Sequence, residues 1–209
     1  MRLTITRHSA NEGGKMRNMR SINTSVTSNP FCQRKVSKDI ICSECYAKAI
    51  VHQYNKCKFI SWENNTKILS EKLMDMSELP TIRKGAIFRF HSFGELINMT
   101  HLRNFFRISN KNPNVTFALW SKRKDIIKKA VDVPENLILI YSTPKINGEP
   151  VLPEGYHKVF TVFTAKYAMD NGIHINCSAD CLDCRQCYYR VTTETINEVL
   201  KSEAHLYHK

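Results

Sequence analysis

Most of the cysteines of this chain lie in two dense groups near its two ends. The chain has eight cysteines in 209 residues, and seven of them belong to these groups. The first group has the pattern Cys32-x9-Cys42-x2-Cys45, and the second has the pattern Cys177-x3-Cys181-x2-Cys184-x2-Cys187. We interpret both groups as metal ligands, and the cysteine-poor segment between them as the framework that brings them together.

The composition is that of an ordinary globular protein, with 42% hydrophobic and 24% charged residues. The length suffices for one domain with its own hydrophobic core. We expect a single domain over 1–209, made of a cysteine-containing N-terminal segment (1–60), a β/α region (61–170) and a C-terminal cysteine segment (171–209). No apolar run approaches the roughly 20 residues of a membrane span, and the N-terminus has no apolar signal core. The sequence therefore predicts a cytoplasmic protein with no membrane partner, in which reduced thiols bind metal rather than form disulfides.

The formal net charge is +12, from 31 Lys and Arg against 19 Asp and Glu. Such an excess favours a polyanionic partner, and nucleic acid is the first candidate. The basic residues are spread along the sequence, with only short clusters at 122–124 and 128–129. A solvated basic surface is therefore the alternative interpretation.

The middle of the chain alternates between short apolar strands and helices. This alternation predicts an α/β fold with a mostly parallel sheet that helices cover. The units are too few for an eight-stranded barrel, so we expect an open, partial (β/α) barrel, with sites at the carboxyl ends of its strands. The expected strands are 2–7, 86–90, 115–120, 137–141 and 158–163, and the expected helices are 46–53, 63–79, 99–109, 124–130 and 192–208, with residues 9–29 as a loop.

The C-terminal group places four thiols within 11 residues. Structural zinc sites usually combine two separated C-x2-C pairs. A dense run with gaps of two and three residues is closer to the ferredoxin pattern, in which thiolates bind successive irons of one cluster. Iron–sulfur binding is therefore the favoured interpretation, with zinc as the alternative and an unliganded run as the third.

The N-terminal group offers three thiols, and three ligands on a four-iron cluster leave one iron open for a substrate or cofactor. Cys57 could supply a fourth ligand, or it could be one of the many cysteines that are simply buried. A C-terminal cysteine that crosses over to this cluster is the third alternative.

Polar residues follow the expected strand 86–90. His91 is interpreted either as a hydrogen-bonded histidine at the strand end or as a site residue that faces a cluster. Gly94 and Glu95 come next, and Glu95 either favours a helix start through its charge or belongs to the site. Arg89 lies inside the apolar strand and needs a partner there.

Five segments carry a family resemblance: Ser21-Ile22-Asn23-Thr24-Ser25, Cys32, Cys42-x2-Cys45-Tyr46-Ala47, Phe88-Arg89-Phe90-His91-Ser92-Phe93-Gly94-Glu95 and Cys181-x2-Cys184-x2-Cys187-Tyr188. In this order they resemble the phage protein family called gene product 88, over most of the chain. Ser92 to Glu95 stand where an acidic residue commonly follows the histidine of that family, and Tyr188 stands where tryptophan is common.

More distantly, Cys42-x2-Cys45-Tyr46-Ala47 is similar to the cluster motif of radical S-adenosylmethionine enzymes, which have a gap of three residues where this chain has nine. The resemblance implies a radical-SAM-like partial barrel with one or two 4Fe–4S clusters. Cys32, Cys42 and Cys45 would hold the first cluster, and the C-terminal group would hold a second or complete the first. S-adenosylmethionine would bind the open iron, with cofactor contacts from His91, Gly94 and Glu95. The alternative function is a non-enzymatic nucleic-acid-binding protein with structural zinc.

Overall fold

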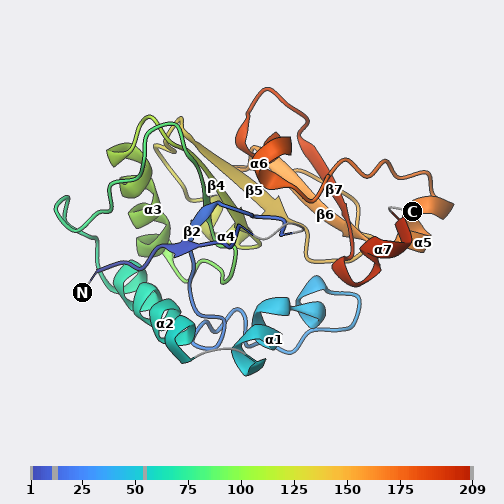
Figure 1. Cartoon of the computed structure of the whole chain (residues 1–209), viewed down its shortest axis with the longest axis horizontal. Coiled ribbons are helices and arrows are strands. Elements are labelled where there is room, and N and C mark those ends of the chain that lie inside the picture. Colours follow the sequence, from blue (N-terminus) through green and yellow to red (C-terminus); the bar gives the residue numbers. More distant parts are fainter. Residues whose placement is uncertain (1, 11–13, 54–55, 208–209) are drawn as a thin grey trace.

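The computed structural model describes residues 2–10, 14–53 and 56–207, and its centre is one seven-stranded sheet with the strand order β1-β2-β3-β4-β5-β6-β7. Strands β2 to β7 run parallel, and β1 pairs with β2 in the antiparallel direction. Each strand therefore lies beside its neighbour in the sequence (Figure 1). The strands are β1 (Thr6–Arg7), β2 (Arg20–Ile22), β3 (Ile87–Phe90), β4 (Thr116–Ser121), β5 (Leu137–Ser142), β6 (Lys158–Phe163) and β7 (Thr195–Val199).

Helices occupy most of the connections between the parallel strands, as a parallel sheet requires. The α-helices are α1 (Tyr46–Gln53), α2 (Lys56–Glu71), α3 (Met99–Lys111), α4 (Lys124–Ile127), α5 (Ala165–Asp170), α6 (Cys181–Cys184) and α7 (Ala204–Tyr207). Three short 3₁₀ helices cover Ile41–Glu44, Gln186–Tyr188 and Lys201–Glu203. No helix among the described residues is long and apolar enough to cross a membrane.

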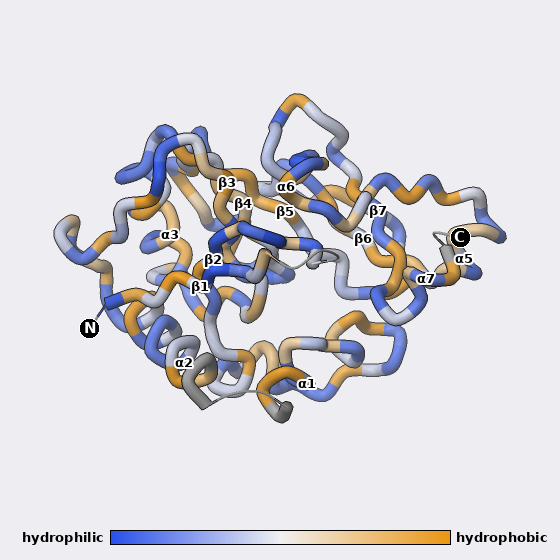
Figure 2. Tube along the Cα trace, in the orientation of Figure 1, coloured by the Kyte–Doolittle hydropathy of each residue, from blue (hydrophilic) through white to orange (hydrophobic). Residues whose placement is uncertain are grey.

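The two faces of the sheet are covered by different parts of the chain. Successive strand residues point to opposite faces. On one face, Phe88 and Phe117 pack with Leu102 of α3 in the larger hydrophobic cluster. On the other face, Trp120 and Phe160 pack in a second cluster, which includes Cys181 and the N-terminal residue Met16. Hydrophobic residues accordingly run along the central strands (Figure 2).

The expected α/β class with a mostly parallel sheet is confirmed, and so are several of the expected elements. Helix 46–53 and strand 158–163 have the expected bounds, and the strand expected at 137–141 continues by one residue to Ser142. The sheet is open, because neither β1 nor β7 has a second neighbouring strand among the described residues.

The prediction of a terminal helix over 192–208 is wrong, because residues Thr195–Val199 form strand β7 and only 204–207 form an α-helix. Ile196, Val199 and Leu200 have helical spacing, which suggested the helix. However, β6 offers an edge with unpaired backbone groups, and β7 pairs with it over five residues from Thr195 to Val199. The β-branched residues of this segment also suit a strand.

Other bounds also differ from the sequence prediction, among them those of the helix expected over 124–130, which covers only Lys124–Ile127. The N-terminal strand is limited to Thr6–Arg7 instead of 2–7, and the expected loop 9–29 contains strand β2. The helix expected over 63–79 covers 56–71. It ends early because Asn104 of α3 donates hydrogen bonds to the carbonyl oxygens of Leu69 and Lys72 and thereby satisfies groups at the helix end.

Candidate functional site

The N-terminal thiol set (Cys32, Cys42 and Cys45) is assembled by the connection after β2. A backbone bond from Cys32 N to Asn29 O of 2.9 Å places the first cysteine in a turn. Cys42 lies in the turn Ile41–Glu44, and Cys45 directly precedes α1. The charges of Cys45 and Cys42 both act on Cys32, so these thiols lie within electrostatic range of one another despite the nine-residue gap, although among the described residues they do not form a group that could hold a metal ion.

Glu95 links this thiol set to the sheet. Its Oε1 accepts hydrogen bonds from Ser121 Oγ at 2.6 Å and from Leu96 N at 2.8 Å, and its Oε2 accepts one from Lys122 N at 2.8 Å. Burial raises the pKa of this carboxyl group, although these donors and Lys122 oppose the rise. Glu95 also raises the pKa of Cys32. Glu95 therefore lies at the carboxyl end of β4 and faces the thiols.

Lys122 supplies positive charge at this site. Its Nζ donates to Ser142 Oγ at 2.8 Å, which joins the carboxyl ends of β4 and β5. Its charge lowers the pKa values of Cys32 and Cys42. Burial outweighs this effect and raises the pKa of Cys32 to about 12. Without a further cation, this thiol therefore stays protonated at neutral pH.

Gly94 allows the loop before Glu95 to reach this position. Its φ is +97°, which is in the region that favours glycine. A Cβ at this position would lie 2.1 Å from Thr24 Oγ1 and 2.6 Å from Thr24 O. The loop therefore packs directly on the backbone that follows β2, and no side chain fits between them.

His91 belongs to the hydrophobic core. Its backbone has φ +61°, and its ring packs against His101 and Phe105 of α3, with ring centroids 5.1 Å apart in both cases. Neither ring nitrogen has a well-formed hydrogen bond. The backbone of Trp120 makes only a minor contribution to the pKa of the ring, which it raises slightly. Burial, with a smaller contribution from Arg89, lowers the pKa of His91 to about 3. The ring is therefore neutral at physiological pH, and its surroundings favour packing at the strand end over contact with a cofactor.

The C-terminal thiol set (Cys177, Cys181, Cys184 and Cys187) lines a single pocket on the face of the sheet that is opposite to α2 and α3. Trp120, Phe160 and Ile196 from three different strands form its floor. The segment that carries the thiols is tied to the sheet and to the N-terminal residues. Cys177 N donates to Asn197 O of β7 at 3.1 Å, and Cys181 N donates to Lys15 O at 2.9 Å.

Lys15 lines this pocket, and Arg89 lies beside it through its contact with Trp120. Lys15 forms an ion pair with Glu198, and its pKa is raised, because the charges of Glu198, Cys177 and Cys181 outweigh its burial. The Arg89 guanidinium lies over the Trp120 ring at 3.8 Å from its centroid. Burial lowers the pKa of Arg89. The net pKa is nevertheless raised, because of electrostatic interactions with Tyr46, Tyr188, Cys181 and Cys187.

The two thiol sets occupy different parts of the molecule, so the expectation that the segment between them brings them together is not confirmed. In Figure 1, α1 in the lower part and α6 in the upper part mark the segments of the N-terminal and C-terminal sets. The charges that act most on Cys32 come from its own set, Glu95 and Lys122, whereas those on Cys187 come from Cys181, Cys177, Lys15 and Arg89. Over the described residues, no three His, Cys, Asp or Glu side chains form a group that could hold a metal ion. The side chain of Cys57 lies outside the described part of the chain.

Sequence reasoning missed several residues at these sites. Lys15 and Trp120 join the C-terminal pocket through the fold, and nothing in the local sequence marks them. Arg89 was noticed as an arginine in an apolar strand, and its partners are the Trp120 ring, His91 O at 3.3 Å and Met16 Sδ at 3.7 Å. Ser121-Lys122 was not missed, because a polar pair directly after a buried strand predicts the carboxyl edge of a parallel sheet.

Comparisons with known proteins give one match. The protein-family model described as Gene product 88 matches residues 3–203. No curated protein matches the sequence, and no solved structure matches the fold.

Proposed function

The chain belongs to the phage gene product 88 family, and we propose that it is an iron–sulfur protein that binds a 4Fe–4S cluster at the N-terminal thiol set. The observation behind this proposal is that the charges of Cys42, Cys45 and Glu95 all act on Cys32, while Glu95 is hydrogen-bonded to Ser121 and Lys122 at the carboxyl edge of the parallel sheet. In open α/β sheets, this edge is where ligands bind.

The order of the elements supports a radical-SAM-like use of this site. The thiol set follows β2, which is the first parallel strand, and Gly94-Glu95 follow β3, which is the second. When bound to the three thiolates, a cluster reduced by an external one-electron donor would supply an open iron for S-adenosylmethionine and the electron for reductive cleavage of its C5′–S bond. The products would be methionine and, after uptake of a hydrogen atom, 5′-deoxyadenosine.

The protein side chains have separate tasks in this proposal. Glu95 Oε2 accepts one hydrogen bond among the described residues, so it retains a lone pair for the amino group of the methionine moiety. Lys122 lies beside Cys32 and Cys42 and offsets the negative charge of a thiolate-bound cluster. The buried surroundings of Cys32 disfavour a free thiolate, and the charge of bound iron reverses this preference.

The test is anaerobic purification, reconstitution with iron and sulfide, and measurement of iron content, absorbance and electron paramagnetic resonance. The reduced protein is then incubated with S-adenosylmethionine, and 5′-deoxyadenosine is quantified. We expect a brown protein that forms 5′-deoxyadenosine, and we expect the C32A/C42A/C45A variant to lose this activity. The matched control is C57A, which keeps the activity if Cys57 is not a ligand.

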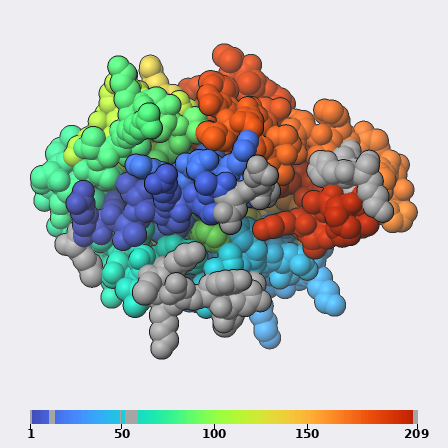
Figure 3. Space-filling view, viewed as in Figure 1, coloured from blue at the N-terminus to red at the C-terminus, as the bar shows by residue number. Residues whose placement is uncertain are grey.

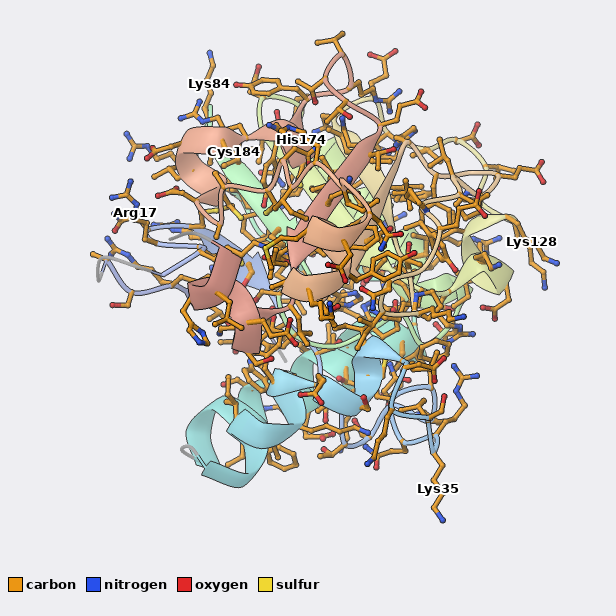
Figure 4. The ribbon with its side chains drawn as sticks, turned by 90° about the vertical axis from the view of Figure 1, so that its right-hand side faces the viewer. Arg17, Lys35, Lys84, Lys128, His174 and Cys184 are labelled. Carbon is orange, nitrogen blue, oxygen red and sulfur yellow. The ribbon has the colours of Figure 1, made fainter. Side chains whose placement is uncertain are left out.

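Other outcomes of this experiment identify the alternative function. A colourless protein with stoichiometric zinc and salt-sensitive DNA binding would establish a nucleic-acid-binding protein and overturn the proposal. Four of the basic side chains bear on that alternative. Arg17, Lys35, Lys84 and Lys128 point outward on different sides of the molecule (Figure 4), so these positive charges do not concentrate on one face.

A further inference from the structure

We propose that the C-terminal thiol set binds a 4Fe–4S cluster of its own, in the pocket lined by Cys177, Cys181, Cys184 and Cys187. This proposal rests on the proposed function for the kind of metal, and it is independent of the N-terminal site. The four thiols suffice for a cluster in which every iron has a protein ligand.

The first argument is that the pocket lacks hydrogen-bond acceptors for its donors. The indole Nε1 of Trp120 and the hydroxyl of Tyr188 are buried and have no hydrogen-bond partner. Both residues line the pocket with the thiols, and both side chains are buried. Buried donors are nearly always paired, so these two indicate an acceptor-rich ligand. The sulfides and thiolates of an iron–sulfur cluster are such acceptors.

The second argument is the positive charge beside the thiols. Lys15 and Arg89 both interact with thiols of this set. Arg89 has no ion pair with a carboxylate among the described residues, and its guanidinium contacts the Trp120 ring instead. A half-buried guanidinium without a carboxylate indicates that a different anion lies nearby. A cluster with four thiolate ligands is an anion.

The third argument concerns the size of the ligand. A tetrahedral zinc ion needs four thiolates at about 2.3 Å from a single point. Among the residues that the structure describes, no three potential ligands form a group of that kind, although the four thiols share one pocket. A cluster binds each thiolate through a different iron, so its ligands lie further apart than those of one ion. The preference for a cluster over zinc comes from the dense spacing of the four cysteines in the sequence.

The pocket is held in place by contacts that do not involve the thiols. Asp180 caps α6 by accepting hydrogen bonds from Leu182 N and Asp183 N. Arg17 binds Asp180 at 2.9 Å and Asp183 at 2.6 Å. These contacts fix the cysteine segment beside the N-terminal residues. In Figure 3, the N-terminal residues (blue) accordingly lie next to the segment that contains α6 (orange-red).

The experiment counts iron and sulfide after anaerobic reconstitution in three proteins: the wild type, C32A/C42A/C45A and C181A/C184A/C187A. We expect roughly eight irons in the wild type and about half in each variant. Loss of all iron from either variant would show a single cluster shared between the sets. If C181A/C184A/C187A contained as much iron per chain as the wild type, the C-terminal set would bind no iron, and the proposal would be overturned. Zinc retained by C32A/C42A/C45A in place of iron would also overturn the proposal.

A second measurement keeps the test valid if the cysteine variants fold poorly. R89Q retains all thiols and removes the positive charge beside the C-terminal pocket. We expect it to shift the reduction potential of one cluster to a more negative value and to leave the other unchanged. The matched control is R103Q, which removes an exposed arginine from α3 and should change neither potential. Equal potentials in R89Q and the wild type would contradict the assignment of Arg89 to the pocket.

Discussion

Gly94 shows how a single residue determines the position of the proposed cofactor contact. Both its backbone conformation and its distance to Thr24 exclude a side chain. Glu95, the next residue, can reach Ser121 and Lys122 only because the loop lies this close to the backbone after β2. The conformation of one residue therefore controls where the carboxylate lies relative to the N-terminal thiol set.

We predict that G94A lowers the free energy of unfolding by about 3–4 kcal/mol, because it adds a steric clash to an unfavourable φ. Urea denaturation of the metal-free protein measures this change. The matched control is G172A, since Gly172 has φ +61° and a Cβ added there would meet no atom within 4 Å; it should cost about 1 kcal/mol. Equal losses in the two variants would contradict the close contact with Thr24.

The pair of buried histidines predicts a specific pH dependence. Burial lowers the pKa of His91 to about 3, and burial together with His91 lowers the pKa of His101 well below its usual value. Between pH 6.5 and about 3, the unfolded chain binds protons that the folded chain does not, so stability falls as the pH falls. We expect a loss of about 2 kcal/mol per histidine between pH 7 and pH 5.

The variant H91N tests this prediction, because asparagine tolerates a positive φ. Its free energy of unfolding should depend less on pH between 7 and 5 than that of the wild type, whatever its absolute stability. H205N is the control, since the side chain of His205 is exposed, and its pH dependence should match the wild type. An unchanged slope in H91N would show that His91 is not buried in its neutral form.

At the scale of elements, α6 is a single turn that depends on its cap and on its contact with Arg17. We predict that D180A destabilises the protein by about 1–2 kcal/mol, because it removes both the N-cap and an ion pair. D183A is the matched control, because it removes only an ion pair whose carboxylate is 68% exposed, and it should change stability by less than about 0.5 kcal/mol. Thermal unfolding of both variants provides the measurement, and similar losses would contradict the importance of the cap.

The elements differ in how well the sequence predicts them. Strands such as β4 and β5 consist of contiguous apolar residues, and their burial on both faces is a local signal. The end of α2 depends on Asn104, which lies more than 30 residues away, and β7 depends on the free edge of β6. No local pattern contains these long-range contacts, and helical spacing in 192–208 therefore led to the wrong assignment.

In the candidate sites, too, the sequence predicts what depends on local spacing and not what depends on long-range contacts. Cysteine spacing alone identified both thiol sets, because dense thiols are rare in an ordinary sequence. It did not indicate that Lys15, Arg89 and Trp120 lie beside the C-terminal set, since these residues come from three separate segments. It also did not place His91 in the core against α3, because that contact depends on the positive φ of His91.

At the scale of the whole molecule, the larger hydrophobic cluster contains no cysteine, whereas the second includes Cys181, with Cys177 and Cys187 packed against it. The larger cluster holds β3, β4 and β5 against α3 without a contribution from metal. We therefore predict that oxidation and chelation of bound iron leave the sheet folded, with hydrogen exchange of β4 and β5 still slow. Exchange should become faster in 29–45 and 177–188, where a ligand no longer orders the chain.

Hydrogen exchange measured by mass spectrometry, before and after iron removal, tests this prediction. C57A with bound iron serves as the reference for cysteine replacement outside the two sets. Global loss of protection after chelation would show that metal is required for the fold itself, as it is in small zinc domains.

The C-terminal pocket also has a consequence for biosynthesis. Lys15 and Arg17 contact Asp180 and its neighbours across more than 160 residues of sequence. During translation, the early half of this pocket leaves the ribosome long before its partner segment. Prematurely terminated chains can complete the first parallel strands and still lack the final ones. The cofactor proposed for this pocket would therefore be inserted only after residues 177–187 have left the ribosome.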